Sequence, residues 1–304
     1  MPAHHIRLKN KSQIPVSPYL FPPQDFNLTT KTHMNTPTHH RILLTGAAGG
    51  LGKALRTCLK SNCSVLRLSD IVDCGPAQES EEVMLADLAD SKAVFAALKD
   101  VDAVVHMGGI SVEGPFGPIL QANLLGAYNL YEAARMHGVK RIIFASSNHV
   151  TGFYSQGETI NANHPPRPDG LYGVSKAFGE DLSRFYFDRY SIETACIRIG
   201  SSFPEPKDRR MLATWLSYDD LHRLITACLS TPVLGHSIIF GASNNSVSWW
   251  DNSCAKHIGF HPKDSSDVFK ENIFARTTSP NLEDPVVQKQ GGAYVAMGPH
   301  GFID

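Results

Sequence analysis

The fold of this chain is decided by the stretch Thr45-Gly46-Ala47-Ala48-Gly49-Gly50-Leu51-Gly52. It follows a short apolar run, Arg41–Thr45, and leads directly into a helical pattern, so it forms the turn between a strand and a helix. In such a turn Gly46 makes the bend, Gly49 lets the backbone approach a pyrophosphate group, and Gly52 lets the helix pack closely. The sequence therefore predicts a dinucleotide-binding unit at the start of the folded region.

Beyond this turn, short apolar runs alternate with helical patterns along the chain. We expect strands at Arg41–Thr45, Val65–Ser69, Val83–Ala86, Ala103–His106, Arg141–Ser146, Thr194–Ile199 and Ser237–Phe240. We expect helices at Leu51–Lys60, Ser91–Leu98, Ile119–His137, Tyr172–Tyr190 and Asp219–Ser230. This alternation predicts a parallel sheet covered by helices on both faces, which is a Rossmann-type doubly wound α/β fold. Residues 41–200 then form the cofactor-binding core, and residues 201–304 form a small C-terminal substrate lobe that completes the single domain.

Residues 1–40 stand outside this pattern. They lack apolar periodicity and are dotted with proline, threonine and histidine. Such a composition is typical of a disordered extension. Met34 lies shortly before the first predicted strand and offers an alternative start for the native chain.

Composition excludes several classes of partner. The formal net charge of -1 gives no general attraction to nucleic acid or to an anionic membrane. No apolar run approaches the roughly 18 residues that a membrane span needs, and no apolar signal core stands near the N-terminus. The six cysteines contain no C-x-x-C pair, which favours reduced thiols over a disulfide or zinc framework. We therefore expect a cytoplasmic enzyme with no metal, no nucleic-acid partner and no membrane partner.

Asp70 points to the identity of the dinucleotide. It ends the second predicted strand, where a carboxylate would accept hydrogen bonds from the adenosine ribose and repel a 2′-phosphate. Because no basic residue stands in the glycine-rich turn, the sequence favours NAD over NADP. Asp87, after the third strand, could line the adenine or instead cap the helix that begins near Ser91. The residues predicted to bind the cofactor are Gly46, Gly49, Leu51, Gly52, Asp70, Ile71, Asp87, Leu88, Gly108 and Gly109.

The strongest chemical signal is Tyr172-Gly173-Val174-Ser175-Lys176 on a predicted helix. Positions i and i+4 share a helix face, so Lys176 lies beside Tyr172. An adjacent ammonium favours the phenolate and should lower the pKa of Tyr172, which can then take a hydroxyl proton from a substrate. Ser147 ends the fifth strand and can orient the same oxygen. The sequence therefore predicts a hydride-transfer site with Tyr172 as the general base.

These motifs resemble a known family. The glycine-rich turn, Ser147 and the Tyr172/Lys176 pair are similar to the extended short-chain dehydrogenase/reductase superfamily over residues 41–304. More narrowly, the chain resembles the uronate dehydrogenases at Gly109-Ile110-Ser111-Val112-Glu113, Ala145-Ser146-Ser147-Asn148-His149, Arg198-Ile199-Gly200-Ser201, Pro204-Glu205-Pro206 and Trp249-Trp250-Asp251-Asn252. Members of that family oxidise the C1 hemiacetal of galacturonate or glucuronate with NAD⁺ and give an aldarolactone.

The resemblance implies a role for particular residues. Tyr172 would be the base, Lys176 would contact both the base and the cofactor, and Ser201 would lie near cofactor and substrate. The sugar acid would be held by Ser111, Ser147, Asn148, His149 and Arg210. The superfamily commonly associates through its long helices, so the resemblance also implies a homo-oligomer.

Arg210 is the residue expected to bind the carboxylate of a uronate substrate. It lies in a loop after the sixth strand, and arginine can bind a carboxylate through two parallel hydrogen bonds. Arg209 and Lys207 stand close by in the sequence and remain alternatives for this role. His149 could instead be a hydrogen-bonded, partly buried histidine.

Two other functions compete with this reading. A nucleotide-sugar epimerase or reductase with bound NAD would need a larger C-terminal domain than the roughly hundred residues after the sixth strand. A non-catalytic NAD(H)-sensing protein would not need a base beside the nicotinamide. The sequence does not decide which uronate epimer is preferred.

Overall fold

The computed structural model describes residues 39–298 and 300, which fall within one compact unit. Most of the predicted N-terminal extension, residues 1–40, lies outside the described residues. His39 and His40 are the exception, because they begin the first strand. The folded pattern therefore starts two residues earlier than the sequence predicts.

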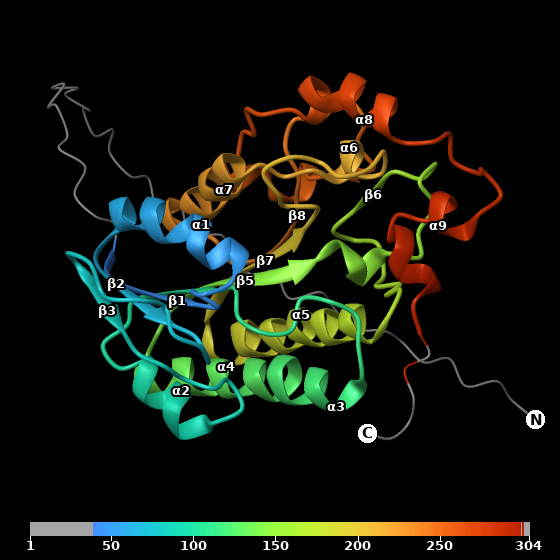
Figure 1. Cartoon of the computed structure of the whole chain (residues 1–304). Helices are drawn as coiled ribbons and strands as arrows, with labels where there is room; N and C mark the ends of the chain where they lie inside the picture. Colours follow the sequence, from blue (N-terminus) through green and yellow to red (C-terminus); the bar gives the residue numbers. More distant parts are fainter. Residues whose placement is uncertain (1–38, 299, 301–304) are drawn as a thin grey trace, which may run out of the picture. The chain divides into compact units, whose positions relative to one another are not determined.

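Seven parallel strands form one sheet, in the spatial order β3-β2-β1-β4-β5-β7-β8. This order confirms the Rossmann-type doubly wound fold predicted from the sequence, with β1 near the middle of the sheet (Figure 1). The strands are β1 His39–Thr45, β2 Cys63–Ser69, β3 Glu81–Val83, β4 Ala103–His106, β5 Arg141–Ser147, β7 Glu193–Ile199 and β8 His236–Gly241.

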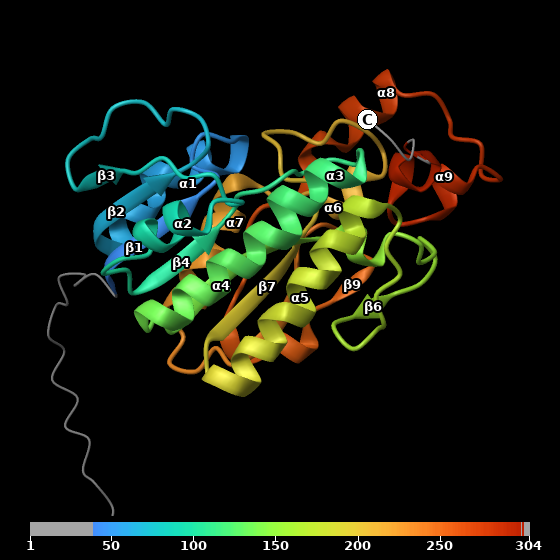
Figure 2. The same ribbon diagram turned by 90° about the horizontal axis from the view of Figure 1, so that it is seen from below.

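Helices cover both faces of this sheet because its strands are apolar on both sides. Ile42 and Leu44 of β1 pack on one face with α1 and α7, whereas Leu43 packs on the other with α2, α4 and α5. Figures 1 and 2 show the two layers. The bounds are α1 Gly50–Leu59, α7 Tyr218–Ser230, α2 Ser91–Ala97, α4 Gly126–His137 and α5 Leu171–Tyr190.

One predicted helix has a more complex start. The pattern at Ile119–His137 corresponds to α3 Phe116–Ile119, a π-helical turn η2 Leu120–Leu125, and then α4. Gly138 ends α4 in the left-handed conformation at φ 75°, which glycine adopts without strain.

The hydrophobic pattern predicts the wrong position for the third strand. The sequence predicts Val83–Ala86, whereas β3 spans Glu81–Val83. Glu81 and Glu82 are acidic and therefore give no apolar signal, but they lie at the edge of the sheet, where Glu81 pairs with Arg56 at 2.6 Å. Ion pairs therefore accommodate the acidic residues in this strand, including Glu81, whose side chain is buried.

Residues between β5 and α5, together with residues after β7, build further structure beside the sheet. A two-stranded parallel sheet, β6 Ile160–Asn161 with β9 Trp250–Asp251, was not predicted from the sequence. A small aromatic core of Tyr154, Phe240, Trp249 and Trp250 supports it. The range 201–304 also contains β8, which belongs to the main sheet. The remaining helices are η1 Lys60–Asn62, η3 Asn148–Thr151, α6 Met211–Thr214, η4 Ser253–Ile258, η5 Ser266–Phe269, α8 Lys270–Arg276, α9 Pro285–Gln288 and η6 Gly292–Ala296.

Among residues 39–298 and 300, no helix combines the length and the hydropathy that crossing a bilayer requires.

Candidate active site

A cavity of about 1130 Å³ opens where the strands of the main sheet end. This is the edge at which open parallel sheets bind their ligands. The structure brings to it every residue that the sequence predicted for cofactor, catalysis and substrate. These are Gly46, Gly49, Leu51, Gly52, Asp70, Ile71, Asp87, Leu88, Gly108, Gly109, Ser111, Ser147, Asn148, His149, Tyr172, Lys176, Ser201 and Arg210.

The glycine-rich turn has the geometry that a dinucleotide requires. Gly46 has a φ of 68°, and a Cβ there would lie 2.6 Å from the backbone of Met107. A Cβ at Gly52 would lie 2.1 Å from the Gly46 oxygen. Gly49 is the N-cap of α1 and has no side chain, so the start of the helix is open to a phosphate group.

Asp70 is fixed at the same end of the cavity. Its carboxylate accepts hydrogen bonds from the backbone nitrogens of Ala48 at 3.0 Å and Ile71 at 2.7 Å. Lys176 and Arg210 are the lysine and arginine that line the cavity within the described residues, and no ion pair there joins Asp70 to a lysine or an arginine. A carboxylate without a neighbouring cation fits a ribose with free hydroxyls, as NAD has, and does not fit a 2′-phosphate.

Asp87 does not take the capping role that the sequence left open. Asp90 caps α2 instead, since its carboxylate accepts hydrogen bonds from the nitrogens of Lys92 and Ala93. Asp87 accepts a local hydrogen bond from the nitrogen of Ala89 at 2.9 Å and lines the cavity.

Tyr172 and Lys176 lie on one face of α5 and are both buried. The Lys176 ammonium is 5.8 Å from the centre of the Tyr172 ring and 5.3 Å from that of Phe144. Burial lowers the pKa of Lys176 to about 8. Burial also raises the pKa of Tyr172 to about 12, against the opposite effect of a hydrogen bond with Ser147. The sequence-based expectation of a lowered pKa for Tyr172 is therefore wrong, because burial has the largest effect on this pKa.

His149 is held by two residues that the sequence analysis did not identify. Its Nδ1 lies 2.7 Å from the Asp169 carboxylate, whose side chain is fully buried. Its ring stacks on Tyr294, with 3.7 Å between the ring centres. With Nδ1 bonded to a carboxylate, the neutral ring has Nε2 as its acceptor.

Arg210 reaches the substrate half of the cavity from the start of α6. Its Nε donates to the Gln290 oxygen at 2.6 Å. With the Asn148 amide turned to satisfy its neighbours, its oxygen accepts from Arg210 at 2.7 Å and its nitrogen donates to the Ile199 oxygen at 3.0 Å. Burial lowers the pKa of Arg210, yet no carboxylate among the described residues forms an ion pair with it.

The two alternatives to Arg210 lie outside the cavity lining. Arg209 donates to the side chain and the backbone oxygen of Thr277. Lys207 lies over the ring of Phe203 at 3.9 Å. Only Arg210 of these three cations lines the cavity in the part of the chain that the structure describes.

Three site residues were missed because their contacts are distant in sequence. Asp169 and Tyr294 meet His149 only in the folded chain, and Tyr294 belongs to η6 near the C-terminus. Glu113 accepts hydrogen bonds from the first turn of α5. Its presence in the stretch Gly109–Glu113, which resembles the uronate dehydrogenases, was the one available signal.

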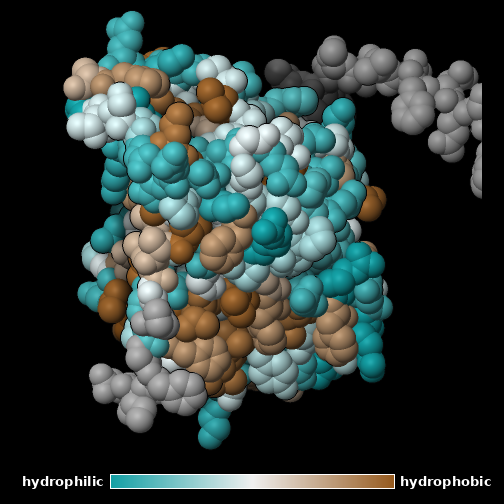
Figure 3. Space-filling view, turned by 90° about the vertical axis from the view of Figure 1, so that its right-hand side faces the viewer, coloured by the Kyte–Doolittle hydropathy of each residue, from teal (hydrophilic) through white to brown (hydrophobic). Residues whose placement is uncertain are grey.

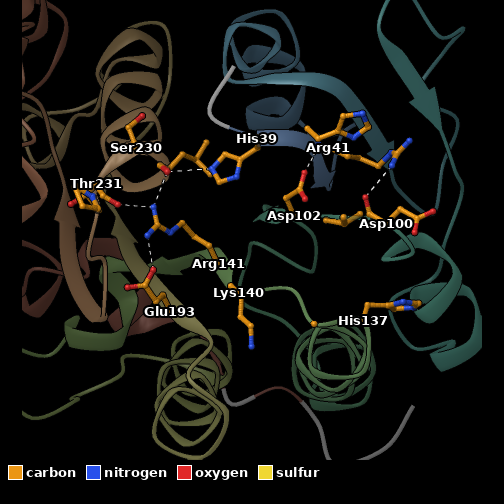
Figure 4. A pocket seen from close by; sticks show the side chains of 15 residues that line it. His39, Arg41, Asp100, Asp102, His137, Lys140, Arg141, Glu193, Ser230 and Thr231 are labelled. Carbon is orange, nitrogen blue, oxygen red and sulfur yellow. Dashed lines mark hydrogen bonds and ion pairs between the residues drawn. The ribbon is translucent and has the colours of Figure 1, made fainter. Parts of the chain in front are cut away.

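A second hollow lies at the opposite edge of the sheet, where strands begin (Figure 4). Its Arg141 is already occupied, because it donates to the Glu193 carboxylate and to the backbone oxygens of Leu229 and Thr231. None of the residues predicted for cofactor, catalysis or substrate lines it. The first cavity is therefore the candidate active site.

Comparison with known proteins agrees with this geometry. The chain is 56% identical to uronate dehydrogenase of Pseudomonas syringae pv. tomato over 274 residues, covering 90% of this chain and 98% of that protein. The chain belongs to the uronate dehydrogenase family. Residues 42–218 also match the model of the NAD dependent epimerase/dehydratase family, to which this family of enzymes is related.

Solved structures of the uronate dehydrogenase family have the same fold. A mutated uronate dehydrogenase is 54% identical and superposes with a TM-score of 0.85, covering 86% of this chain and 94% of that one. A mutant of the enzyme from Agrobacterium tumefaciens, complexed with NAD, is 50% identical with a TM-score of 0.84, covering 86% and 98%.

Proposed function

We propose that this chain oxidises a hexuronic acid, D-galacturonate or D-glucuronate, at its C1 hemiacetal with NAD⁺ and forms the aldarolactone. The observation that carries the proposal is Arg210, a half-buried cation without a carboxylate partner among the described residues, in the same cavity as Tyr172, Lys176 and Ser147. A substrate carboxylate would supply the missing partner. The cofactor is NAD, in keeping with the glycine turn, with Asp70 and with the family.

The cofactor would bind in the half of the cavity that contains the glycine-rich turn. The starts of α1 and of the turn would face the pyrophosphate, and the Asp70 carboxylate would accept the ribose hydroxyls. When bound there, NAD⁺ would supply the acceptor for the hydride of C1 and a positive charge that favours a nearby phenolate. Lys176 and Ser201 line the cavity between the two halves.

Tyr172 would take the proton of the C1 hydroxyl. The phenol must lose its own proton first, and the ammonium of Lys176, 5.8 Å from the ring centre, would stabilise the phenolate. Ser147 would hold the C1 oxygen through its hydroxyl. As the C1–H bond breaks toward the nicotinamide and the O–H bond breaks toward Tyr172, C1 becomes the lactone carbonyl carbon.

The remaining polar residues would recognise the sugar acid. Arg210 would bind the carboxylate at C6, supported by Asn148 and the Gln290 oxygen. Ser111 and His149 would contact ring hydroxyls, with His149 Nε2 as an acceptor. Residues 41–200 supply most of the cofactor half, whereas Arg210 comes from the predicted lobe at 201–304.

We further propose that the chain forms a homo-oligomer through α3, α4 and α5. Large apolar side chains are exposed there, with Phe116 49%, Tyr128 48% and Val174 46% exposed. Figure 3 shows hydrophobic residues gathered on the lower part of the face toward which α3 and the start of α5 point. Exposed apolar area of this kind supports a protein interface. Light scattering would distinguish a stable oligomer from a monomer.

A cytoplasmic location is supported by the cysteines. All six are free thiols in the described structure. Thiols that stay unpaired are typical of a reducing compartment.

Formation of NADH with a panel of sugars tests the proposed function. Purified protein with NAD⁺ should oxidise galacturonate or glucuronate much faster than galactose, glucose or UDP-sugars. Equal rates with neutral sugars would contradict carboxylate recognition. Interconversion of UDP-sugars without net NADH would instead indicate an epimerase, and NAD⁺ binding without turnover of any substrate would indicate a sensor.

A further inference from the structure

Glu113 is a buried carboxylate that the proposed reaction does not use directly. It lies two residues after Ser111, and its side chain is only 2% exposed. Its Oε1 accepts a hydrogen bond from the backbone nitrogen of Leu171 at 3.0 Å, and Oε2 accepts one from that of Tyr172 at 2.8 Å. Its carboxylate therefore binds the backbone of the proposed general base itself.

Within residues 39–298 and 300, Glu113 is the side chain that accepts hydrogen bonds from the backbone nitrogens of Leu171 and Tyr172. The N-cap, Gly170, has no side chain, and the first turn contains no acidic residue. The first N–H groups of a helix lack partners within the helix, and its N-terminus carries partial positive charge. Glu113, which is distant in the sequence, supplies both a hydrogen-bond acceptor for these N–H groups and a negative charge near the helix N-terminus. A charged acceptor at this place stabilises the first turn of α5, where Tyr172 lies.

Gly170 leaves the space that the carboxylate occupies. A Cβ at this position would lie 2.2 Å from Oε2 of Glu113. The φ of Gly170 is -168°, an extended conformation that any residue adopts. The glycine is therefore required by the volume of the Glu113 carboxylate and not by the backbone conformation.

The loop that contains Ser111 is anchored a second time. The Asn123 side chain accepts from the nitrogen of Ile110 at 2.8 Å and donates to its oxygen at 3.0 Å. The same amide nitrogen lies 2.8 Å from Oγ of Ser175, on α5. Ser111 thus lies between two connections to α5, one through Asn123 and one through Glu113.

We propose that Glu113 is a positioning residue that fixes the Tyr172 hydroxyl relative to the sugar bound at Ser111. This inference rests on the proposed function, because it assigns Tyr172 as the base and Ser111 as a substrate contact. Rotation or fraying of the first turn of α5 would displace the phenol from the C1 hydroxyl. Glu113 prevents that displacement by holding the amide of Tyr172 itself.

Two variants break the same contact in different ways. Glu113→Gln keeps the size of the side chain but presents an NH₂ group to one of the two backbone donors. Gly170→Ala keeps the carboxylate and fills its space. Each variant should lower kcat for uronate on the order of 100-fold, because a misplacement of about 1 Å has an effect of this size. The Kd for NAD⁺ should stay unchanged. The kcat of the double variant should be no lower than that of either single variant. Both changes remove the same contact, so their effects should not add.

Asp220 provides a matched control. Its side chain is fully buried, and it also accepts two backbone hydrogen bonds from a distant segment, at Lys263 and Asp264. Asp220→Asn should reduce stability but leave kcat unchanged at temperatures where the protein is folded. Hydrogen exchange at Leu171 and Tyr172 should accelerate in the Glu113 and Gly170 variants and stay slow in the Asp220 variant.

The outcomes separate the two proposals. If the unaltered protein oxidises uronate and Glu113→Gln keeps its kcat, the positioning role is wrong and the proposed function stands. A kcat loss of the same size in Asp220→Asn, or loss of NAD⁺ binding in Glu113→Gln, would also overturn the positioning role. If the unaltered protein does not oxidise uronates, both proposals are overturned, whatever the exchange rates.

Discussion

Replacing Arg210 by glutamine should destroy the preference for acidic sugars. The side chain donates to the Gln290 oxygen at 2.6 Å and to the Asn148 amide oxygen at 2.7 Å, so the guanidinium is held in one place before substrate binds. No carboxylate among the described residues lies within ion-pair distance of it, although Asp208 and Asp169 act on it electrostatically from farther away. A uronate would therefore meet an oriented cation that loses no competing ion pair on binding.

The size of the effect follows from this arrangement. Removing one member of a hydrogen-bonded, desolvated charge pair costs about 2–5 kcal/mol. We take about 3 kcal/mol, since Arg210 is only half-buried, and this corresponds to a loss on the order of 100-fold in affinity. The loss should fall on kcat/KM for galacturonate and glucuronate. It should spare kcat/KM for galactose, which has no carboxylate.

Initial rates of NADH formation, measured over a range of sugar concentrations, give both values. Arg209→Gln is the matched control, because Arg209 neighbours Arg210 but bonds to Thr277 outside the cavity lining. It should behave like the unaltered protein. An equal loss of activity toward galactose in Arg210→Gln would show that the arginine supports the fold and not carboxylate recognition. A larger effect from Arg209→Gln would move the carboxylate site.

Three further changes test the cofactor site, the base and a buried imidazole. Tyr172→Phe should lower kcat about 1000-fold, within the range for loss of a general base, with NAD⁺ binding retained in a calorimetric titration; an active variant would exclude Tyr172 as the base. Asp70→Ala should bring kcat/KM for NADP⁺ closer to that for NAD⁺, and an unchanged ratio would contradict the ribose contact. Burial lowers the pKa of His106 to about 3, so between pH 6.5 and 3 the unfolded chain binds a proton that the folded chain does not. The unfolding free energy should therefore fall with decreasing pH by up to about 1.4 kcal/mol per unit from this group. The change His106→Gln should reduce this slope, and an unchanged slope would contradict the assignment to His106.

Much of the fold could be predicted because it depends on local patterns. The turn at Gly46 and Gly52 requires small residues for steric reasons, which are visible in the sequence. The apolar strands that follow it have a clear hydrophobic signal. The edge strand at Glu81–Val83 was misplaced, because an edge strand is stabilised by ion pairs as well as by burial. The short β6–β9 sheet was missed, since two-residue strands leave almost no pattern.

Some active-site residues could likewise be predicted from the sequence, and others could not. Asp70, Tyr172 and Lys176 follow strands or share a helix face, so their proximity could be worked out from spacing. Asp169 and Tyr294 meet His149 through tertiary contacts, and no spacing rule relates residues so far apart. The direction of the pKa shift of Tyr172 also depended on burial, which the sequence could not give.

The place of Gln290 and Tyr294 near the end of the chain sets the order in which the two halves of the site are completed during synthesis. The residues around the glycine-rich turn leave the ribosome early, although a domain generally folds as a unit. Arg210 acquires its Gln290 partner, and His149 its stacking ring, only after translation has passed Tyr294. The contacts that hold Arg210 and His149 in the sugar pocket are therefore among the last that the nascent chain can make. A proteolytic cut just before Gln290 should likewise separate NAD⁺ binding from turnover.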